Sequence, residues 1–207
     1  MKMSELTVLF QGDSITDAGR TGGDPAGLGG GYPMFIDAMF HAENPGRDIT
    51  FINRGISGNR VRDLRARWQE DCIDLKPDIL SILIGINDTW RRYDSNDPTS
   101  AEKYEEDYRY ILNETREKLP DTDLVILEPF VLSSPADRQA WRVDLDPKIH
   151  AARKLAAEFE AAFIPLDGIF NAAAIAATPE RWSPDGVHPS PAGHALIAEH
   201  WLNTVVL

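Results

Sequence analysis

The sequence contains little cysteine and no long hydrophobic run. Cys72 is its one cysteine, so the chain cannot form an internal disulfide, and nothing points to an oxidising compartment. No window approaches the roughly 20 apolar residues that a membrane-spanning helix needs. Residues 1–10 lack the apolar stretch and cleavage site of a signal peptide. We therefore expect a soluble, cytoplasmic protein in which Cys72 packs in the core on a helix.

Basic residues are scarce relative to acidic ones. The chain has 33 Asp and Glu residues against 21 Lys and Arg residues, which gives a net charge of −12. Such a surface repels phosphate backbones and anionic lipid headgroups, so nucleic acids and membranes are poor candidate partners. Neutral ligands such as sugars carry no such penalty.

What is present is the pattern of an α/β protein. The 207 residues, 43% of them hydrophobic, suit a single domain over 1–207 with a full core. Short apolar runs typical of buried parallel strands alternate with segments whose apolar residues have helical spacing. The runs are 8–10, 49–52, 79–84, 124–127 and 163–166. One helical stripe consists of Val61, Leu64, Trp68, Cys72 and Leu75, and others lie within 104–115, 149–163 and 192–201.

Strands alternating with helices predict a parallel sheet covered on both faces. In such sheets ligands bind at the carboxyl ends of the strands. Polar clusters follow the first three runs directly, at 12–14, 55–58 and 85–88. We therefore expect these three loops to face one cleft.

Ser14, Asp185 and His188 suit acyl transfer, which needs a nucleophile, a base and a group that orients the base. Ser14 comes just after the first strand, and Gly12 lets the backbone approach closely there. Asp185 precedes His188 by three residues, so its carboxylate can accept a hydrogen bond from the ring and fix the tautomer. Taken alone, Ser14 could mark an ordinary turn, and Asp185 could cap a loop beside a surface histidine.

Asn87 and Gly58 are candidate donors to a developing oxyanion. A side-chain amide and a glycine N–H at neighbouring strand ends can point at the same oxygen, with the Ser14 N–H as a third donor. Alternatively, Asn87 braces a turn and Gly58 adopts a positive φ. Because all these groups fall at one edge of one sheet, the acyl-transfer interpretation is favoured.

Four motifs in this order resemble the conserved blocks of the SGNH, or GDSL, hydrolase family: GDSIT, NRGISG, GIND and DGVHP. The resemblance implies a flavodoxin-like three-layer α/β/α sandwich with a five-stranded parallel sheet. It also implies Ser14 as nucleophile and oxyanion donor, Gly58 and Asn87 as further donors, and His188 as a base oriented by Asp185.

The longer stretches GISGNRVRDLRARW, IGINDTWRRYD and HPSPAGH resemble intracellular acetylxylan esterases, which implies an acetylated-sugar substrate and a homo-oligomer. One departure is Pro184, which stands where those esterases have a tryptophan before the aspartate. We therefore expect the aromatic wall of the pocket to be built differently.

Four further residues are candidate substrate contacts. Trp90 and Trp182 flank two of the motifs, and a sugar ring could stack on either, although both could also be packing residues. Arg54 could bind substrate or pair with surface carboxylates. Asp13 could line the pocket floor, but we favour a role in holding the Ser14 turn.

No metal and no cofactor are expected. His188, His194 and His200 are spaced by six residues, which turns successive side chains away from one another on a helix. The glycine-rich stretch 19–31 is expected to be a loop and lacks the order of a phosphate-binding motif. No G-x-S-x-G motif occurs, which argues against an α/β-hydrolase layout.

Other functions remain open at this stage. A thioesterase or lysophospholipase acting on longer acyl chains could use the same four motifs. A non-catalytic carbohydrate-binding protein and a metal-dependent phosphoesterase are more distant alternatives.

Overall fold

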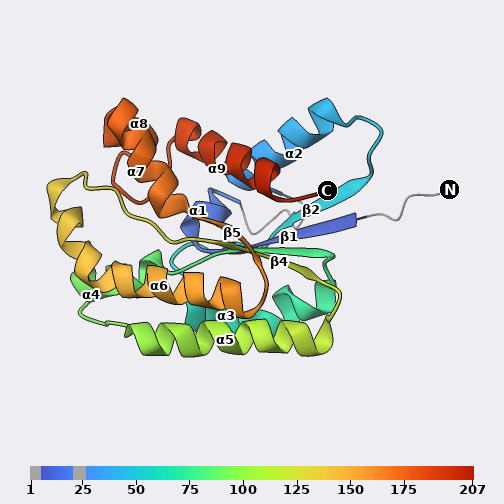
Figure 1. Ribbon diagram of the computed structural model, residues 1–207, viewed down its shortest axis with the longest axis horizontal. Coiled ribbons are helices and arrows are strands. Elements are labelled where there is room, and N and C mark those ends of the chain that lie inside the picture. Colours follow the sequence, from blue (N-terminus) through green and yellow to red (C-terminus); the bar gives the residue numbers. More distant parts are fainter. Residues whose placement is uncertain (1–5, 21–26) are drawn as a thin grey trace.

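The computed structural model describes residues 6–20 and 27–207, and all five strands join one parallel sheet (Figure 1). The strand order is β2-β1-β3-β4-β5. The strands are β1 (Leu6–Gly12), β2 (Ile49–Asn53), β3 (Ile79–Leu83), β4 (Asp123–Leu127) and β5 (Ala162–Ile164). Each of the five predicted runs contains a strand, so the predicted fold class is confirmed.

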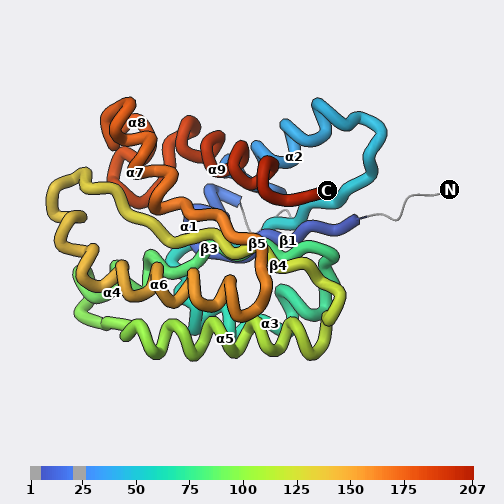
Figure 2. Tube along the Cα trace, viewed as in Figure 1, coloured from blue at the N-terminus to red at the C-terminus, as the bar shows by residue number. Residues whose placement is uncertain are grey.

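Helices cover both faces of the sheet (Figures 1 and 2). One face carries α1 (Ser14–Asp17), α2 (Tyr32–Glu43), α7 (Leu166–Ala176), α8 (Pro179–Trp182) and α9 (Pro191–Thr204). The other carries α3 (Val61–Asp71), α5 (Ala101–Lys118) and α6 (Arg142–Glu158). The short elements are α4 (Ile86–Asp94) and the 3₁₀ turns η1 (Ile73–Leu75) and η2 (Ala136–Trp141).

Alternation along the strands divides the core between these faces. Phe10 packs with residues of α2 and α9, whereas its neighbour Leu9 packs with residues of α3 and α5. Trp201 of α9 is fully buried and donates from Nε1 to Ser81 Oγ at 3.0 Å. Trp68 of α3 is also buried. These two tryptophans therefore belong to the core on opposite faces of the sheet.

Three predicted boundaries are wrong, because in each case the apolar pattern continues past the point where the helix or strand ends. The stripe that starts at Val61 leaves its helix at Asp71; Cys72 is the buried residue after the helix end, and Leu75 lies in η1. Phe163 lies in β5 and not on the preceding helix. Leu166 was expected to end the fifth strand, but α7 begins there.

The topology places a crevice between β1 and β3. The chain leaves β1 for β2 on one side and then crosses to β3 on the other, so the connections diverge at this point. Gly12 pairs with Leu83, which brings the ends of the two strands level. Ligands in sheets of this kind bind where such connections diverge. The residues after β1 and β3 are therefore the first place to look for a site.

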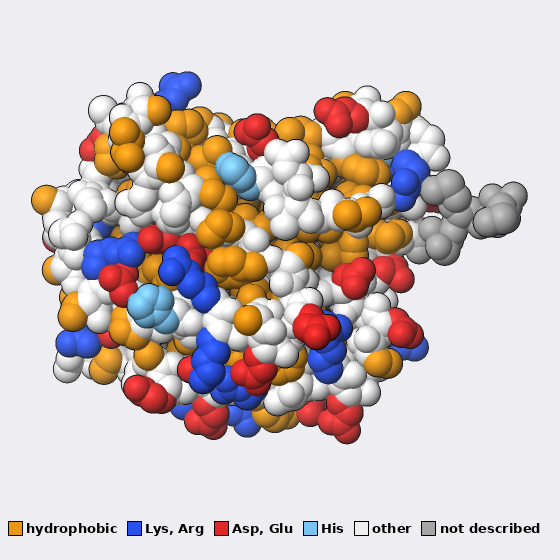
Figure 3. Space-filling model, viewed as in Figure 1, with side chains coloured by type: hydrophobic (Ala, Val, Ile, Leu, Met, Phe, Trp, Pro, Cys, Tyr) orange, Lys and Arg blue, Asp and Glu red, His pale blue; other side chains and the backbone are white. Residues whose placement is uncertain are grey.

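The surface mixes charges of both signs. Figure 3 shows acidic and basic side chains interspersed over the part of this face where α5 and α6 lie. Among the described residues, no helix has the length and apolarity to cross a membrane. Of the glycine-rich stretch 19–31, residues 21–26 lie outside the described part of the chain.

Candidate active site

A tight turn after β1 presents the first polar cluster. Asp13 caps α1, because its Oδ1 accepts the N–H of Ile15 at 3.0 Å. A Cβ at Gly12 would lie 2.2 Å from Thr16 Oγ1 and 2.4 Å from Leu83 O, so only glycine fits. The expected close approach at Gly12 and the expected turn-holding contact of Asp13 are both present.

Ser14, His188 and Asp185 form a chain of hydrogen bonds. Ser14 Oγ lies 2.9 Å from His188 Nε2, and His188 Nδ1 lies 2.7 Å from Asp185 Oδ2. Asp185 Oδ1 also accepts the main-chain N–H groups of Val187 at 2.9 Å and His188 at 2.7 Å. An ionised Asp185 holds the proton on Nδ1, which leaves Nε2 to accept the Ser14 hydroxyl. The three residues predicted from distant parts of the sequence therefore meet.

The pKa values of this chain of groups suit proton transfer. Partial burial disfavours an ionised Asp185, but hydrogen bonds from the ring and N–H of His188 and the N–H of Val187 outweigh it. They hold the pKa of Asp185 well below its ordinary value. The hydrogen bond to Asp185 raises the pKa of His188 above its ordinary value, against the opposing effect of burial. Asp185 thus stays ionised beside the ring and favours the protonated form of His188.

The loop that carries Asp185 is held by the segment after β4. Gly186 O accepts the N–H of Leu132 at 2.9 Å, and Arg138 Nε donates to Asp185 O at 3.1 Å. Gly186 has a φ of +81°, and a Cβ there would lie 2.4 Å from Ser134 O and 2.7 Å from Leu132 O. The carboxylate is therefore placed by main-chain contacts that leave no room for a larger residue.

Asn87 at the start of α4 and Gly58 on the loop after β2 belong to segments that are tied to each other. Asn87 is buried in the first turn of α4, and its Nδ2 donates to Asn59 O at 3.1 Å. Asp88 Oδ2 accepts the N–H of Val61 at 3.2 Å. Gly58 has a φ of +83°. Asn87 therefore braces a loop and Gly58 adopts a positive φ, as the alternative interpretation in the sequence analysis expects. The amide nitrogen of Asn87 still has a second hydrogen, which it can donate to an oxyanion.

The sequence profile of the GDSL-like Lipase/Acylhydrolase family matches residues 10–196, which include every residue of this arrangement. The chain belongs to the GDSL-like lipase/acylhydrolase family. Its fold is accordingly that of an SGNH hydrolase, as the resemblance of the four motifs implied. The sequence prediction of the family is confirmed.

Relatives of this GDSL-like hydrolase include characterised and solved proteins. An acetylxylan esterase from Geobacillus stearothermophilus is 36% identical over 208 residues, which cover 96% of this chain and 93% of that protein. The crystal structure of Axe2, an acetylxylan esterase from the same organism, superposes with a TM-score of 0.86 at 35% identity, covering 98% of this chain and 95% of Axe2. A GDSL-like lipase from Parabacteroides merdae has a TM-score of 0.92 at 40% identity, with 96% and 94% coverage.

Further solved forms of Axe2 are described as catalytic mutants. In these a serine, an aspartate or a histidine is replaced by alanine. The same three residue types make the hydrogen-bonded chain in this GDSL-like hydrolase.

Asn53 is a supporting residue of this family member that the sequence analysis did not single out. Its fully buried amide donates to Thr16 O at 2.7 Å and Leu28 O at 2.8 Å, and its Oδ1 accepts the N–H of Gly55 at 2.8 Å. It therefore joins the Ser14 turn to the loop that leads to Gly58. The available signal was its place at the start of the NRGISG motif, directly at the end of a strand.

Two buried carboxyl groups lie beside the site. Burial raises the pKa of Asp13 to about 7, although the N–H of Ile15 opposes the change. Burial likewise raises the pKa of Asp88 to about 7. Asp13 is fully enclosed, and its Oδ2 has no hydrogen-bond partner among the described residues.

The other predicted substrate contacts are dispersed. Trp90 lies against the triad, with its ring centroid 5.7 Å from that of His188. Trp182 packs against the core and donates from Nε1 to Ala173 O at 3.1 Å. Arg54 Nε lies 3.8 Å from Asp71 Oδ1. Trp90 thus lies at the site, Trp182 makes a packing contact and Arg54 forms an ion pair. The roles of these residues in substrate binding stay predictions.

Arg138, which contacts Asp185, and the rings of Trp141 and Tyr93 beyond Trp90 were not predicted. Tyr93 follows Trp90 by three positions on α4, so the two share a helix face, and that spacing was a usable signal. Arg138 and Trp141 come from η2, outside the four motifs, and only the folded chain brings Arg138 to Asp185 and Trp141 to Trp90.

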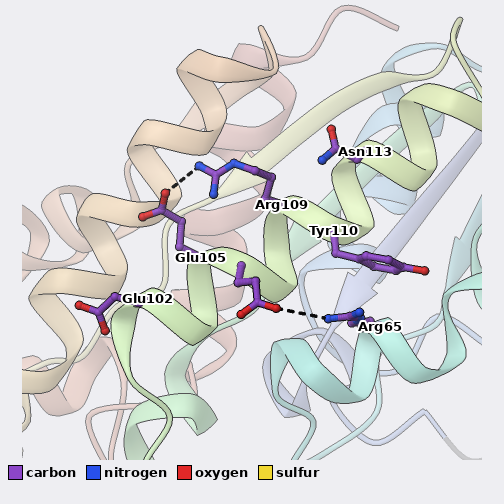
Figure 4. A pocket seen from close by; sticks show the side chains of 7 residues that line it. Arg65, Glu102, Glu105, Arg109, Tyr110 and Asn113 are labelled. Carbon is purple, nitrogen blue, oxygen red and sulfur yellow. Dashed lines mark hydrogen bonds and ion pairs between the residues drawn. The ribbon is translucent and has the colours of Figure 1, made fainter.

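A hollow of about 420 Å³ lies elsewhere, between α3 and α5 (Figure 4). It is lined by charged side chains that form ion pairs with one another. Arg109 pairs with Glu105 at 2.7 Å, and Arg65 lies 4.0 Å from Glu106 and 3.9 Å from the centre of the Tyr110 ring. No triad residue lines it.

Metal-binding geometry is absent from residues 6–20 and 27–207, where no three His, Cys, Asp or Glu side chains gather suitably. His194 is buried in α9, and its Nδ1 accepts the N–H of Tyr32 at 3.1 Å. Burial lowers the pKa of His194 to about 4, so this ring is neutral.

Proposed function

We propose that this protein is a serine acetylesterase that removes acetyl groups from acetylated carbohydrates such as xylo-oligosaccharides. Ser14 is the nucleophile, His188 the general base and acid, and Asp185 the residue that orients His188. The N–H groups of Ser14 and Gly58 and the side chain of Asn87 stabilise the oxyanion. The observation that carries the proposal is the hydrogen-bonded chain from Ser14 through His188 to Asp185.

In the first half-reaction Ser14 Oγ attacks the ester carbonyl carbon while its proton passes to His188 Nε2. The carbonyl oxygen becomes an oxyanion that the three donors stabilise. As the tetrahedral intermediate collapses, the bond from carbon to the alcohol oxygen breaks. His188 gives its proton to that oxygen, the alcohol leaves, and an acetyl group remains on Ser14.

In the second half-reaction water attacks the acetyl carbonyl while its proton passes to His188 Nε2. The bond to Ser14 Oγ then breaks, and His188 returns the proton to Ser14. Acetate leaves, and the enzyme is restored. Asp185 stays ionised throughout and stabilises the imidazolium in both halves.

Two observations support the acetylated-carbohydrate substrate. Two of the relatives reported above, both from Geobacillus stearothermophilus, are acetylxylan esterases that match nearly the whole chain. The net charge of −12 disfavours anionic phospholipid but imposes no penalty on neutral sugars. The coarser assignment to an esterase family does not depend on either.

The proposal is tested with a panel of nitrophenyl esters from acetyl to decanoyl, together with acetylated xylo-oligosaccharides. We expect the highest kcat/KM on the acetyl ester and release of acetate from the oligosaccharides. An optimum at octanoyl would assign the protein to the thioesterases or lysophospholipases. Sugar binding without turnover of any ester would identify a non-catalytic carbohydrate-binding protein.

A further inference from the structure

A second hollow, of about 390 Å³, lies between α4 and η2. This volume falls in the range of roughly 300–1,000 Å³ typical of small-molecule sites. Its lining includes Trp90, Tyr93, Asp94, Asp137, Arg138 and Trp141. Trp90 is shared with the triad, because its ring also contacts the ring of His188. The Trp90 ring therefore links the hollow to the triad.

The aromatic rings of this hollow form a continuous row that starts at His188. The Trp90 ring lies 5.2 Å from that of Trp141, with the planes at 54°. The Tyr93 ring stacks on Trp141 at 5.2 Å, with the planes only 9° apart. Trp141 is 3% exposed, whereas Tyr93 is 39% exposed. The buried ring thus fixes the exposed one as a flat platform.

Arg138 ties this row to the triad. Its guanidinium lies 4.2 Å from the centre of the Trp141 ring and 5.4 Å from that of Trp90. Its Nε donates to Asp185 O at 3.1 Å, and its Nη1 contacts the Asp137 carboxylate at 2.8 Å. The wall of the hollow and the loop of the catalytic aspartate are therefore one packed unit.

The chemistry of the triad determines which part of an ester reaches this hollow. His188 must protonate the leaving oxygen, so that oxygen lies within hydrogen-bond reach of Nε2. The alcohol part of the substrate therefore extends from the His188 side of Ser14. Trp90 lies against the His188 ring and forms part of the wall of the hollow.

We propose that this hollow is the subsite for the alcohol part of the ester and binds a neutral sugar ring, an inference that rests on the proposed function. The C–H face of the sugar stacks on Tyr93 and the edge of Trp90. The carboxylates of Asp94 and Asp137 accept hydrogen bonds from sugar hydroxyls.

The test compares kcat/KM on an acetylated xylo-oligosaccharide with kcat/KM on nitrophenyl acetate. For Tyr93→Ala we expect this ratio to fall by about tenfold, mainly through KM for the oligosaccharide, because a stacked ring is lost. Tyr93→Phe keeps the ring and should restore the ratio. Tyr110→Ala is the matched control, since Tyr110 is also an exposed tyrosine, 40% exposed, but lies on α5 away from the triad (Figure 4).

Binding without turnover gives an independent measurement. Ser14→Ala protein is titrated with unacetylated xylotriose and followed by tryptophan fluorescence, with and without Tyr93→Ala. We expect Kd to rise by about tenfold in the double variant. An equal loss of activity on both esters, or an unchanged ratio and Kd, would overturn the subsite. Wild-type protein that hydrolyses nitrophenyl acetate but no acetylated sugar would instead overturn the proposed function, and the subsite with it.

Discussion

His188 is subject to opposing influences on its pKa. The hydrogen bond to Asp185 favours the protonated ring, burial disfavours it, and the net effect is a raised pKa. Because the neutral ring is the form that accepts the Ser14 proton, a raised pKa moves the acidic limit of activity to higher pH. The group is inactive below its pKa and active above it.

We therefore predict that kcat/KM rises with pH through an apparent pKa above about 6.5, the ordinary value for histidine. In Asp185→Asn the midpoint should fall, and kcat should drop by about 10⁴-fold, since the amide favours the wrong tautomer. The measurement is a pH–rate profile of both proteins on nitrophenyl acetate. A flat profile between about pH 5 and about pH 8 in the wild type would contradict the role of His188.

Asn87 is predicted to act only as charge develops on the carbonyl oxygen. Asn87→Ala should lower kcat by about 10²- to 10³-fold with little change in KM, because the hydrogen bond strengthens in the transition state. Steady-state kinetics on nitrophenyl acetate separate the two constants. A rise in KM alone would show that Asn87 binds the ground state.

Individual residues were predictable where a motif carried them. Ser14, Asp185 and His188 could be named because their spacing and order suit a triad, and the folded chain brings them together. Asn53 had a signal in its place at the start of NRGISG, whereas Arg138 had none, because it acts through the main-chain carbonyl of Asp185 on a distant loop. Such partners depend on how the loops pack and leave no local pattern.

At the scale of elements, the loop of Asp185 depends on the segment after β4. Gly186 lies against Ser134 O and Leu132 O in a conformation that side chains rarely adopt. These contacts fix the position of the Asp185 loop relative to His188. The stability of the loop and the geometry of the triad are therefore linked.

Gly186→Ala should consequently reduce the stability of this loop and disturb the geometry of the triad. The left-handed conformation alone costs about 1–2 kcal/mol for a residue with a Cβ, and the close contacts add to that. We predict a Tm lower by about 4 °C or more and a clear fall in kcat. Differential scanning calorimetry and nitrophenyl acetate kinetics measure the two effects. Gly46→Ala is the control, since a Cβ there has no neighbour within 4 Å; equal Tm values for the two variants would refute the prediction.

Strands were easier to predict than helices. All five strands contain short apolar runs, and that pattern is distinctive. The helix α7 has the sequence LDGIFNAAAIA, whose alanines give little contrast between faces, so its pattern was missed. The end of α3 was missed because the apolar spacing continues through η1, where Lys76 takes a left-handed conformation.

For the whole molecule, alternation predicted the layers but not the order of the strands. The position of β1 between β2 and β3 depends on which way each crossover passes, which hydrophobic spacing does not encode. This order brings the loops after β1 and β3 to one crevice. The agreement of fold, motifs and relatives across nearly the entire chain assigns the protein to its family, and the central claim beyond that is that Ser14 attacks the ester.

The most direct test is covalent labelling of the intact protein with a small alkyl fluorophosphonate, followed by mass spectrometry of the whole chain and its peptides. We predict one phosphonyl group per chain, on the peptide that contains Ser14, with complete loss of esterase activity. Ser14→Ala should take up no label, whereas Ser57→Ala should label normally, because the Ser57 hydroxyl donates to Asp17 at 2.6 Å. Labelling of Ser14→Ala, or retention of more than about a tenth of wild-type kcat by that variant, would contradict the account.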